Sequence, residues 1–284
     1  MVSATRMLLT LALAAGLAPA ADNQLTPGEQ RAGWKLMFDG NSFRNWRDPA
    51  KLTPPGDSWV IEGGCLRARP APRIREDLFS EESFGDFEFK FDWRLPPGGN
   101  SGVKYRIQRI VFMDFTKVQL GEGGWEGQVF RELTSPKSVR SKMAPEATAN
   151  EFALGFEFQL VDDERDPGAR SDPRTATGAL YSMIAPRAHA ARPIGEWNQS
   201  LFVVQGDRIE HWINGVKVLE GSLNSEDVRA GAQQRWGRYP ILVEMFTKPK
   251  PAGLICLQHH TTEAWFRNLK IRRTGSGRSV RNAP

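Results

Sequence analysis

The chain has 284 residues, of which 40% are hydrophobic and 25% are charged, a balance that excludes a disordered chain and a multipass membrane protein. Its 16 Phe and nine Trp against three Tyr, together with 27 Gly and 19 Pro, predict a mostly β protein in which aromatic strands are separated by turns. The net charge of +5 falls to +2 when the terminal cations Arg6, Arg278 and Arg281 are set aside, and no basic run is interleaved with aromatic residues, so no nucleic acid partner is expected.

The first 20 residues are predicted to be a signal peptide. Arg6 precedes an apolar run from Met7 to Leu17 that is too short to cross a bilayer, and Ala18-Pro19-Ala20 offers the small residues that signal peptidase reads. The alternative is a buried N-terminal helix. No later stretch approaches the ~20 apolar residues of a membrane-spanning helix. We therefore expect a periplasmic or secreted chain, without a membrane span, whose cleaved peptide ends at Ala20 or Ala21.

Strands are predicted wherever hydrophobic residues alternate with polar ones. Residues 87–95 place Phe87, Phe89, Phe91, Trp93 and Leu95 on one face, and residues 156–160 repeat the pattern with Glu157 and Gln159 pointing away from the core. The same criteria predict further strands at residues 59–61, 65–68, 103–107, 200–205, 209–213, 216–219, 254–258 and 264–271.

These short strands predict an all-β domain of two antiparallel sheets packed face to face. Asn214-Gly215 lies between two strand patterns and predicts a two-residue hairpin turn with positive φ at both positions. Residues 121–150, at the centre of an insertion spanning about 107–155, are polar and rich in Gly, which indicates a functional loop or a disordered excursion. Residues 273–284 are expected to be a disordered basic tail.

Cys65 and Cys256 have two possible states in an exported protein. They could form one disulfide, or they could be two separately buried thiols.

Familiar catalytic motifs are absent from the sequence. It has no Gly-x-Ser-x-Gly elbow, His-Glu-x-x-His helix, phosphate-binding glycine loop or Cys-x-x-Cys pair. Nor does it have a Glu-x-Asp-x-x-Glu strand, so local spacing does not support two-carboxylate glycoside hydrolysis. The remaining candidates are polar residues predicted to face away from the core: Asp92, Arg94, Lys104, Arg106, Glu157 and Gln159. They form either a solvated face or a concave surface that binds sugar hydroxyl groups.

An ordered series of short motifs resembles the 3-keto-disaccharide hydrolase family over residues 33–272. The motifs are residues 33–40 (GWKLMFDG), 84–87 (FGDF), 100–105 (NSGVKY), 156–163 (FEFQLVDD), 195–198 (GEWN), 211–215 (HWING), 257–260 (LQHH) and 266–268 (FRN). The resemblance implies a single concanavalin A-like jelly-roll domain that cleaves the glycosidic bond of sugars oxidised at C3. It also implies a divalent metal ion in some members. This chain has His259 and Thr261 where relatives often have Asp and Gly, and Asp166 where they have His.

Roles for individual residues follow from that chemistry, in which a base removes the C2 proton and an enolate forms before elimination and hydration. Glu157 is the expected base or metal ligand, unless it is only paired to Lys104 or Arg106. His260 is the expected base, acid or metal ligand, unless it is structural. Lys104 and Arg106 would hold the enolate oxygen. The remaining substrate-binding candidates are Asn100, Gln159, Asp162 and Tyr181, with Trp197 stacking on a sugar face.

The expected partner is therefore an oligosaccharide or glycoside. A non-catalytic carbohydrate-binding module of the same fold is the alternative function. An adhesion or scaffold domain is a third class, disfavoured because no appended domain or anchor is evident in the sequence.

Overall fold

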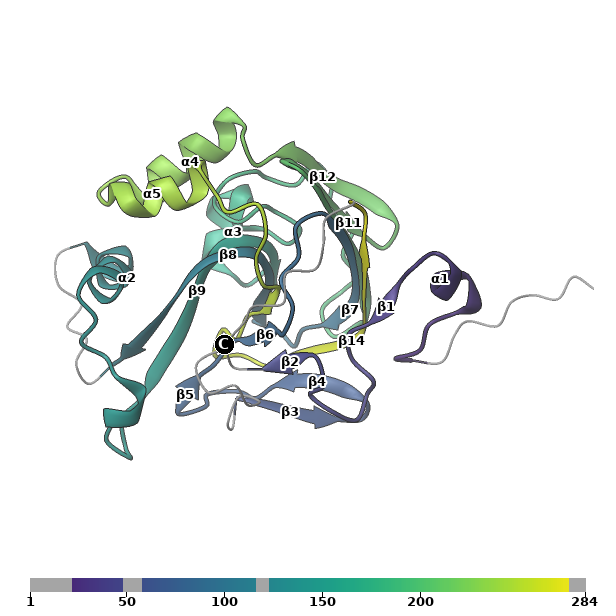
Figure 1. Cartoon of the computed structure of the whole chain (residues 1–284), viewed down its shortest axis with the longest axis horizontal. Helices are drawn as coiled ribbons and strands as arrows, with labels where there is room; N and C mark the ends of the chain where they lie inside the picture. Colours follow the sequence, from purple (N-terminus) through teal and green to yellow (C-terminus); the bar gives the residue numbers. More distant parts are fainter. Residues whose placement is uncertain (1–21, 48–57, 116–122, 276–284) are drawn as a thin grey trace, which may run out of the picture.

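A computed structural model describes residues 22–47, 58–115 and 123–275, and its strands form two sheets stacked face to face (Figure 1). The predicted signal peptide and most of the predicted basic tail lie outside the described residues. The predicted all-β architecture is confirmed: the fold is a two-sheet, antiparallel jelly-roll sandwich. None of the helices in the described part of the chain has the length and apolar character that a membrane crossing needs.

The first sheet has eight strands, and β7 and β14 lie at its centre. Phe87, Phe89, Phe91 and Trp93 are all at most 2% exposed, which confirms the predicted alternation along β7. In spatial order the strands are β12 (Val216–Ser222), β11 (Arg208–Ile213), β10 (Asn198–Gln205), β7 (Phe87–Arg94), β14 (Ala264–Arg273), β4 (Cys65–Ala68) and β3 (Trp59–Glu62), and β1 (Lys35–Leu36) also pairs with β14.

The second sheet has six strands and carries two long ones, β8 and β9. Phe156, Phe158 and Leu160 of β9 are buried in the core, as predicted, so Glu157 and Gln159 occupy the opposite face. The strand order is β2 (Trp46–Arg47), β6 (Leu78–Ser80), β13 (Cys256–Leu257), β8 (Asn100–Asp114), β9 (Ala149–Val161) and β5 (Ile74–Arg75), the last of which runs parallel to β9.

The expected insertion at about 107–155 differs from the loop that its composition indicates. β8 continues to Asp114 and β9 begins at Ala149, so both ends of the segment are paired strand. Between them lie α2 (Gly124–Thr134) and a short 3-10 turn, η1 (Arg140–Lys142). Val129 of α2 is fully buried in the core cluster, so this helix is docked on the sandwich.

Two helices that the sequence did not predict close one end of the sandwich. They are α4 (Glu226–Trp236) and α5 (Pro240–Thr247), which lie side by side (Figure 1). Trp236 stacks on Phe246, and Phe246 contacts Phe156 of β9 edge to face. The remaining short elements are α1 (Pro27–Arg31), α3 (Pro167–Ser171) and η2 (Pro173–Thr175).

The structure tests the predicted hairpin turn and the state of the two cysteines. Asn214 and Gly215 have φ values of 49° and 81° in the turn between β11 and β12, which confirms the predicted hairpin. Cys65 and Cys256 are both free and buried, so the structure selects two separate thiols over a disulfide.

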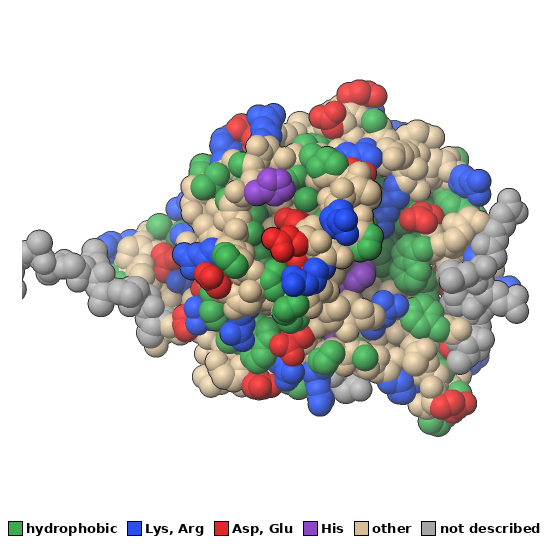
Figure 2. Space-filling view, turned by 180° about the vertical axis from the view of Figure 1, so that it is seen from behind, with side chains coloured by type: hydrophobic (Ala, Val, Ile, Leu, Met, Phe, Trp, Pro, Cys, Tyr) green, Lys and Arg blue, Asp and Glu red, His purple; other side chains and the backbone are tan. Residues whose placement is uncertain are grey.

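The surface carries basic and acidic side chains side by side. Figure 2 shows both signs interspersed over the face that it presents.

Candidate active site

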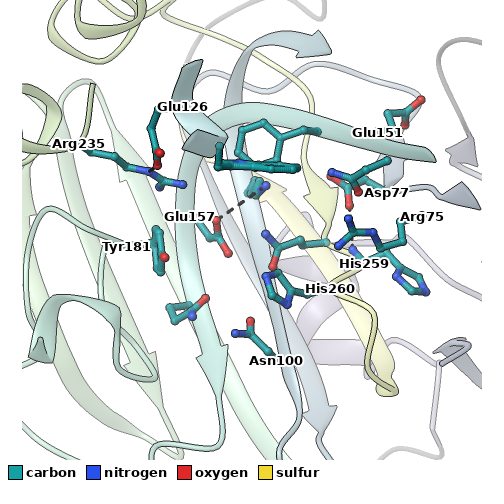
Figure 3. Close-up of a pocket in the computed structure, with 16 residues that line it drawn as sticks. Arg75, Asp77, Asn100, Glu126, Glu151, Glu157, Tyr181, Arg235, His259 and His260 are labelled. Atoms are coloured by element: carbon teal, nitrogen blue, oxygen red, sulfur yellow. Dashed lines mark hydrogen bonds and ion pairs between the residues drawn. The ribbon is translucent and has the colours of Figure 1, made fainter. Parts of the chain in front are cut away.

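A cavity of about 430 Å³ lies on the outer face of the six-stranded sheet, beneath α2 and α4 (Figure 3). Its volume is within the usual range for a small-ligand site. The cavity brings together six of the predicted site residues, namely Asn100, Lys104, Glu157, Gln159, Tyr181 and His260. Its other lining residues are Arg75, Asp77, Trp125, Glu126, Asn150, Glu151, Phe152, Arg235, Gln258 and His259.

An ion pair forms the floor of the cavity. Lys104 of β8 is the register partner of Glu157 of β9, and its ammonium lies 3.8 Å from the Glu157 carboxylate (Figure 3). The Lys104 ammonium also donates to the Ala153 carbonyl at 3.2 Å and lies 4.4 Å from the centre of the Phe152 ring. Lys104 is 1% exposed and Glu157 is 8% exposed, so the pair is held away from bulk water at the bottom of the site.

The backbone of Gly102 makes room for the Glu157 side chain. A Cβ atom at Gly102 would collide with Oε1 of Glu157, so no other residue type fits there without moving the carboxylate. The Gln159 amide, turned so that its nitrogen faces inward, donates to Oε1 of Glu157 and to the Ser101 carbonyl, each at 3.2 Å. Glu157 is therefore fixed by its neighbours on both sides.

The charges around Glu157 shift its pKa in both directions. Burial raises the pKa of Glu157, whereas Lys104 and Arg235 lower it and Asp77 raises it further. The net direction is upward, which makes the carboxylate a stronger proton acceptor than an ordinary glutamate once it is ionised.

Asp77 is a site residue that sequence reasoning missed. It precedes β6, is 2% exposed, and accepts a hydrogen bond from the His259 backbone N–H at 2.8 Å. Burial raises the pKa of Asp77, and Lys104 lowers it. In the sequence, Asp77 directly precedes the apolar residues Leu78 and Phe79. This position indicates a buried carboxyl group, and carboxyl groups are rarely buried unless they have a partner.

The adjacent histidines have different environments. The His259 ring packs edge to face against Trp59 and shares a 2.8 Å hydrogen bond with the Arg69 carbonyl, and burial lowers the pKa of His259 to about 4. His260 stays exposed at the cavity mouth. The surrounding protein displaces part of the hydration of the His260 ring, and together with Lys104 and Arg75 this lowers the pKa of His260 below 6.5.

Helix residues complete the mouth of the cavity. Trp125 of α2 meets Phe152 of β9 edge to face, with ring centres 5.5 Å apart. Arg235 of α4 lies 4.9 Å from the Tyr181 ring, and its Nε is 3.7 Å from the Glu126 carboxylate of α2. Trp125, Glu126 and Arg235 were not predicted as site residues, because neither helix was predicted.

Three predicted site residues lie elsewhere. Arg106 has a φ of 48° at an irregularity in β8, and its side chain turns to the β10–β11 turn, where it contacts Gly206 and Asp207. Asp162 accepts hydrogen bonds from the Gly98 backbone and from Arg165, which makes it a turn-stabilising residue.

Trp197 contacts the other sheet. The guanidinium groups of Arg94 and Arg267 lie 5.0 and 4.1 Å from its ring. Asp92 also faces this side, where it pairs with Asn268 and Arg267, so the expected set of outward polar residues is divided between two sheets and does not form one surface.

The residues around Glu157 do not fit a divalent metal ion. Glu157 already faces the Lys104 ammonium, and within the described ranges no group of three or more His, Cys, Asp or Glu side chains could hold a metal. The second histidine, His259, uses a ring nitrogen on the Arg69 carbonyl.

Comparisons with known proteins place this geometry in context. Residues 33–272 match the family model of the 3-keto-alpha-glucoside-1,2-lyase-like domain. A protein of Bacteroides thetaiotaomicron named 3-keto-disaccharide hydrolase is 25% identical over 254 residues, which cover 84% of this chain and 78% of that protein.

Solved structures share the fold. One, of a candidate glycosyl hydrolase from Parabacteroides distasonis, superposes with a TM-score of 0.64 at 24% identity and covers 90% of this chain and all of that one. A second from the same species has a TM-score of 0.55 at 21% identity and covers 85% of this chain and 99% of the other.

Proposed function

The chain belongs to the family of 3-keto-alpha-glucoside-1,2-lyase-like domains, and from this premise we propose that it cleaves the glycosidic bond of sugars carrying a ketone at C3. The ketone acidifies the proton on C2, and the glycosidic oxygen on C1 is β to the carbanion that forms there. Removal of the C2 proton gives an enolate, whose electrons form the C1–C2 double bond as the C1–O bond breaks. The leaving oxygen takes up a proton. Water then adds at C1 and a proton returns to C2, so the net reaction is hydrolysis.

The observation that carries the proposal is the spacing of Glu157 and Lys104. Glu157 is the proton acceptor, and Lys104 is the cation that stabilises the enolate oxygen on C3. The two groups are 3.8 Å apart at the cavity floor, a distance suited to a C–H and a C=O on neighbouring ring carbons. A positive charge in a site shielded from water stabilises a developing oxyanion more strongly than it would in bulk water.

His260 is the proton carrier for the leaving group. Its ring lies at the mouth of the cavity, on the side from which the leaving group departs to solvent. Its lowered pKa keeps the ring neutral at pH 7, so one nitrogen can donate while the other accepts. Asn100, Gln159 and Tyr181 line the same cavity and are placed to orient hydroxyl groups.

Glu157→Gln is the test of this proposal. Removal of a general base lowers a rate by ~10²- to 10⁴-fold, so release of the aglycone from a 3-keto disaccharide should fall by that factor. Exchange of the C2 proton in deuterated water, followed by NMR, should fall in parallel because it reports the first step alone. The matched control is Glu196→Gln, an exposed glutamate outside the cavity, and the unoxidised disaccharide should not react.

Near-normal turnover by Glu157→Gln would exclude Glu157 as the base. If the unmodified protein binds the sugar but never cleaves it, and Glu157→Gln changes only the affinity, the chain is the alternative, a carbohydrate-binding module.

We also propose that the protein is exported and that residues 1–20 are removed. The support is the pattern of charge, apolar run and small residues at the N-terminus. Intact-mass measurement of the protein from its native host should show an N-terminus at or directly after Ala21. Retention of residues 1–20 would refute export by this route.

A further inference from the structure

Two buried oxygen atoms on the cavity floor have no hydrogen-bond partner among the described residues. They are Oδ2 of Asp77 and Oε1 of Gln258. Their residues are 2% and 8% exposed, and both line the cavity that holds Glu157. A buried acceptor left without a donor costs ~1–3 kcal/mol. Such atoms in a pocket therefore indicate where a ligand supplies the donor.

The protein holds both acceptors in place. Oδ1 of Asp77 accepts the His259 backbone N–H at 2.8 Å, which fixes the carboxyl plane. The backbone of Gln258 donates to the Gly102 carbonyl at 2.8 Å and accepts from the Ser101 hydroxyl at 2.8 Å. β13 pairs Leu257 with Leu78, and the same antiparallel register puts Gln258 across from Asp77. The two oxygens thus come from facing positions on one surface.

The chemistry of this pair selects the kind of ligand. An anion would meet the Asp77 carboxyl group, and an apolar group would leave both acceptors unsatisfied. The donors nearest the Asp77 carboxyl group are the Cys256 thiol, which is weak, and the Ala153 backbone N–H, and neither makes a hydrogen bond to Oδ2. Hydroxyl groups on neighbouring carbons supply two donors at the spacing of adjacent side chains, whereas a ketone supplies none.

We propose that Asp77 and Gln258 are specificity-determining residues that accept hydrogen bonds from ring hydroxyl groups of the sugar. This inference rests on the proposed function and extends it to the sugar hydroxyl groups that the site recognises. The oxidised carbon faces Lys104, and the hydroxyl-bearing carbons face the acceptor pair. A site built to satisfy a substrate hydroxyl rejects the analogue that lacks it, because its buried acceptor is then unpaired.

Binding of non-reacting sugars tests the pair without any need for catalysis. Calorimetry would compare methyl glucosides of both anomers with derivatives in which fluorine replaces the hydroxyl at C2, C4 or C6. Fluorine preserves size but cannot donate. With the unmodified protein, at least one replacement should weaken binding about tenfold, the factor that corresponds to ~1.4 kcal/mol.

Asp77→Asn should remove this discrimination. Because the His259 N–H needs an acceptor, the amide oxygen takes the position of Oδ1 and the amide NH₂ group faces the cavity. The parent glucoside should then bind about tenfold more weakly, and the fluorine penalty should shrink to less than about threefold. Gln258→Met is the second variant, in case Asp77→Asn does not fold. Asp163→Asn, whose carboxyl group accepts the Thr177 N–H outside this cavity, is the matched control.

If fluorine replacement weakens binding equally in the unmodified protein and in both variants, Asp77 and Gln258 do not accept hydrogen bonds from the sugar. The proposal is also wrong if the unmodified protein binds none of the glucosides. Cleavage is scored separately. If the variants lose the effect of fluorine replacement but the unmodified protein cleaves no 3-keto sugar, the role of Asp77 and Gln258 stands and the proposed reaction is wrong.

Discussion

Gly102 determines where the Glu157 carboxylate lies. Gly102→Ala should displace this carboxylate from its present position while leaving the pairing of β8 and β9 intact. Because a misplacement of ~1 Å can cost ~10²-fold in rate, we predict a loss of about that size in kcat on a 3-keto disaccharide, measured beside the melting temperature. Gly28→Ala, whose added Cβ would lie 3.8 Å from the nearest atom, is the matched control. Unchanged kcat in Gly102→Ala would show that the position of Glu157 does not matter.

The sequence predicts the direction of a side chain only where strand pairing is regular. The alternation of Phe156 and Phe158 correctly placed Glu157 and Gln159 on the face that carries the cavity. It failed at Arg106, because the positive φ at that residue and the irregularity after Tyr105 change the direction of the side chain. The sequence could place Asp77 next to a buried strand but not in the site, because its neighbours there come from β8, β9 and β13, far away in the sequence.

At the scale of elements, α2 is the wall of the active site. It brings Trp125 and Glu126 to the cavity while Val129 anchors it to the core. Val129→Ala should lower the free energy of unfolding by about 1–3 kcal/mol and raise KM more than it lowers kcat, because the wall loosens while the floor is unchanged. Denaturant unfolding and steady-state kinetics would measure both. Val216→Ala, on the exposed end of β12, is the control. An unchanged KM would show that α2 does not contact the sugar.

Strands were easier to predict than helices in this chain. The predicted strands from residues 59 to 271 recur in the structure, but those predicted at 103–107 and 156–160 are parts of the much longer β8 and β9. The segment 121–124 is rich in Gly and was read as a loop, although α2 begins within it at Gly124. α4 has a polar sequence whose buried side is formed by Val228, Gly231, Ala232 and Trp236, too mixed a set for a clear apolar face.

At the scale of the whole molecule, buried histidines make stability depend on pH. Burial lowers the pKa of His211 to about 4 in the folded protein, against 6.5 for a free side chain. Between these values the unfolded chain binds the proton and the folded chain does not, so this residue's contribution to stability is lost as pH falls from 6.5 to about 4.

We predict that His211→Gln lowers stability but flattens its dependence on pH in this window, as measured by urea unfolding at several pH values. The buried carboxyl groups of Asp77 and Glu157 act in the opposite direction, since their pKa values are raised. The comparison between variants is therefore decisive, with His189→Gln, at an exposed histidine, as the control for loss of a histidine. A pH profile in His211→Gln as steep as that of the unmodified protein would contradict the prediction.

The position of β14 has a consequence for the order of folding. This last strand lies between β7 and β4, and Asn268 exchanges hydrogen bonds with Asn23, 245 residues earlier in the chain. Until Arg273 has been synthesised, β7 and β4 each have an edge without its partner, and the eight-stranded sheet cannot close. Contacts so distant in the sequence form slowly. The eight-stranded sheet can therefore be completed only after residues 264–273 have been synthesised, so its other strands must wait for this one before they are all paired.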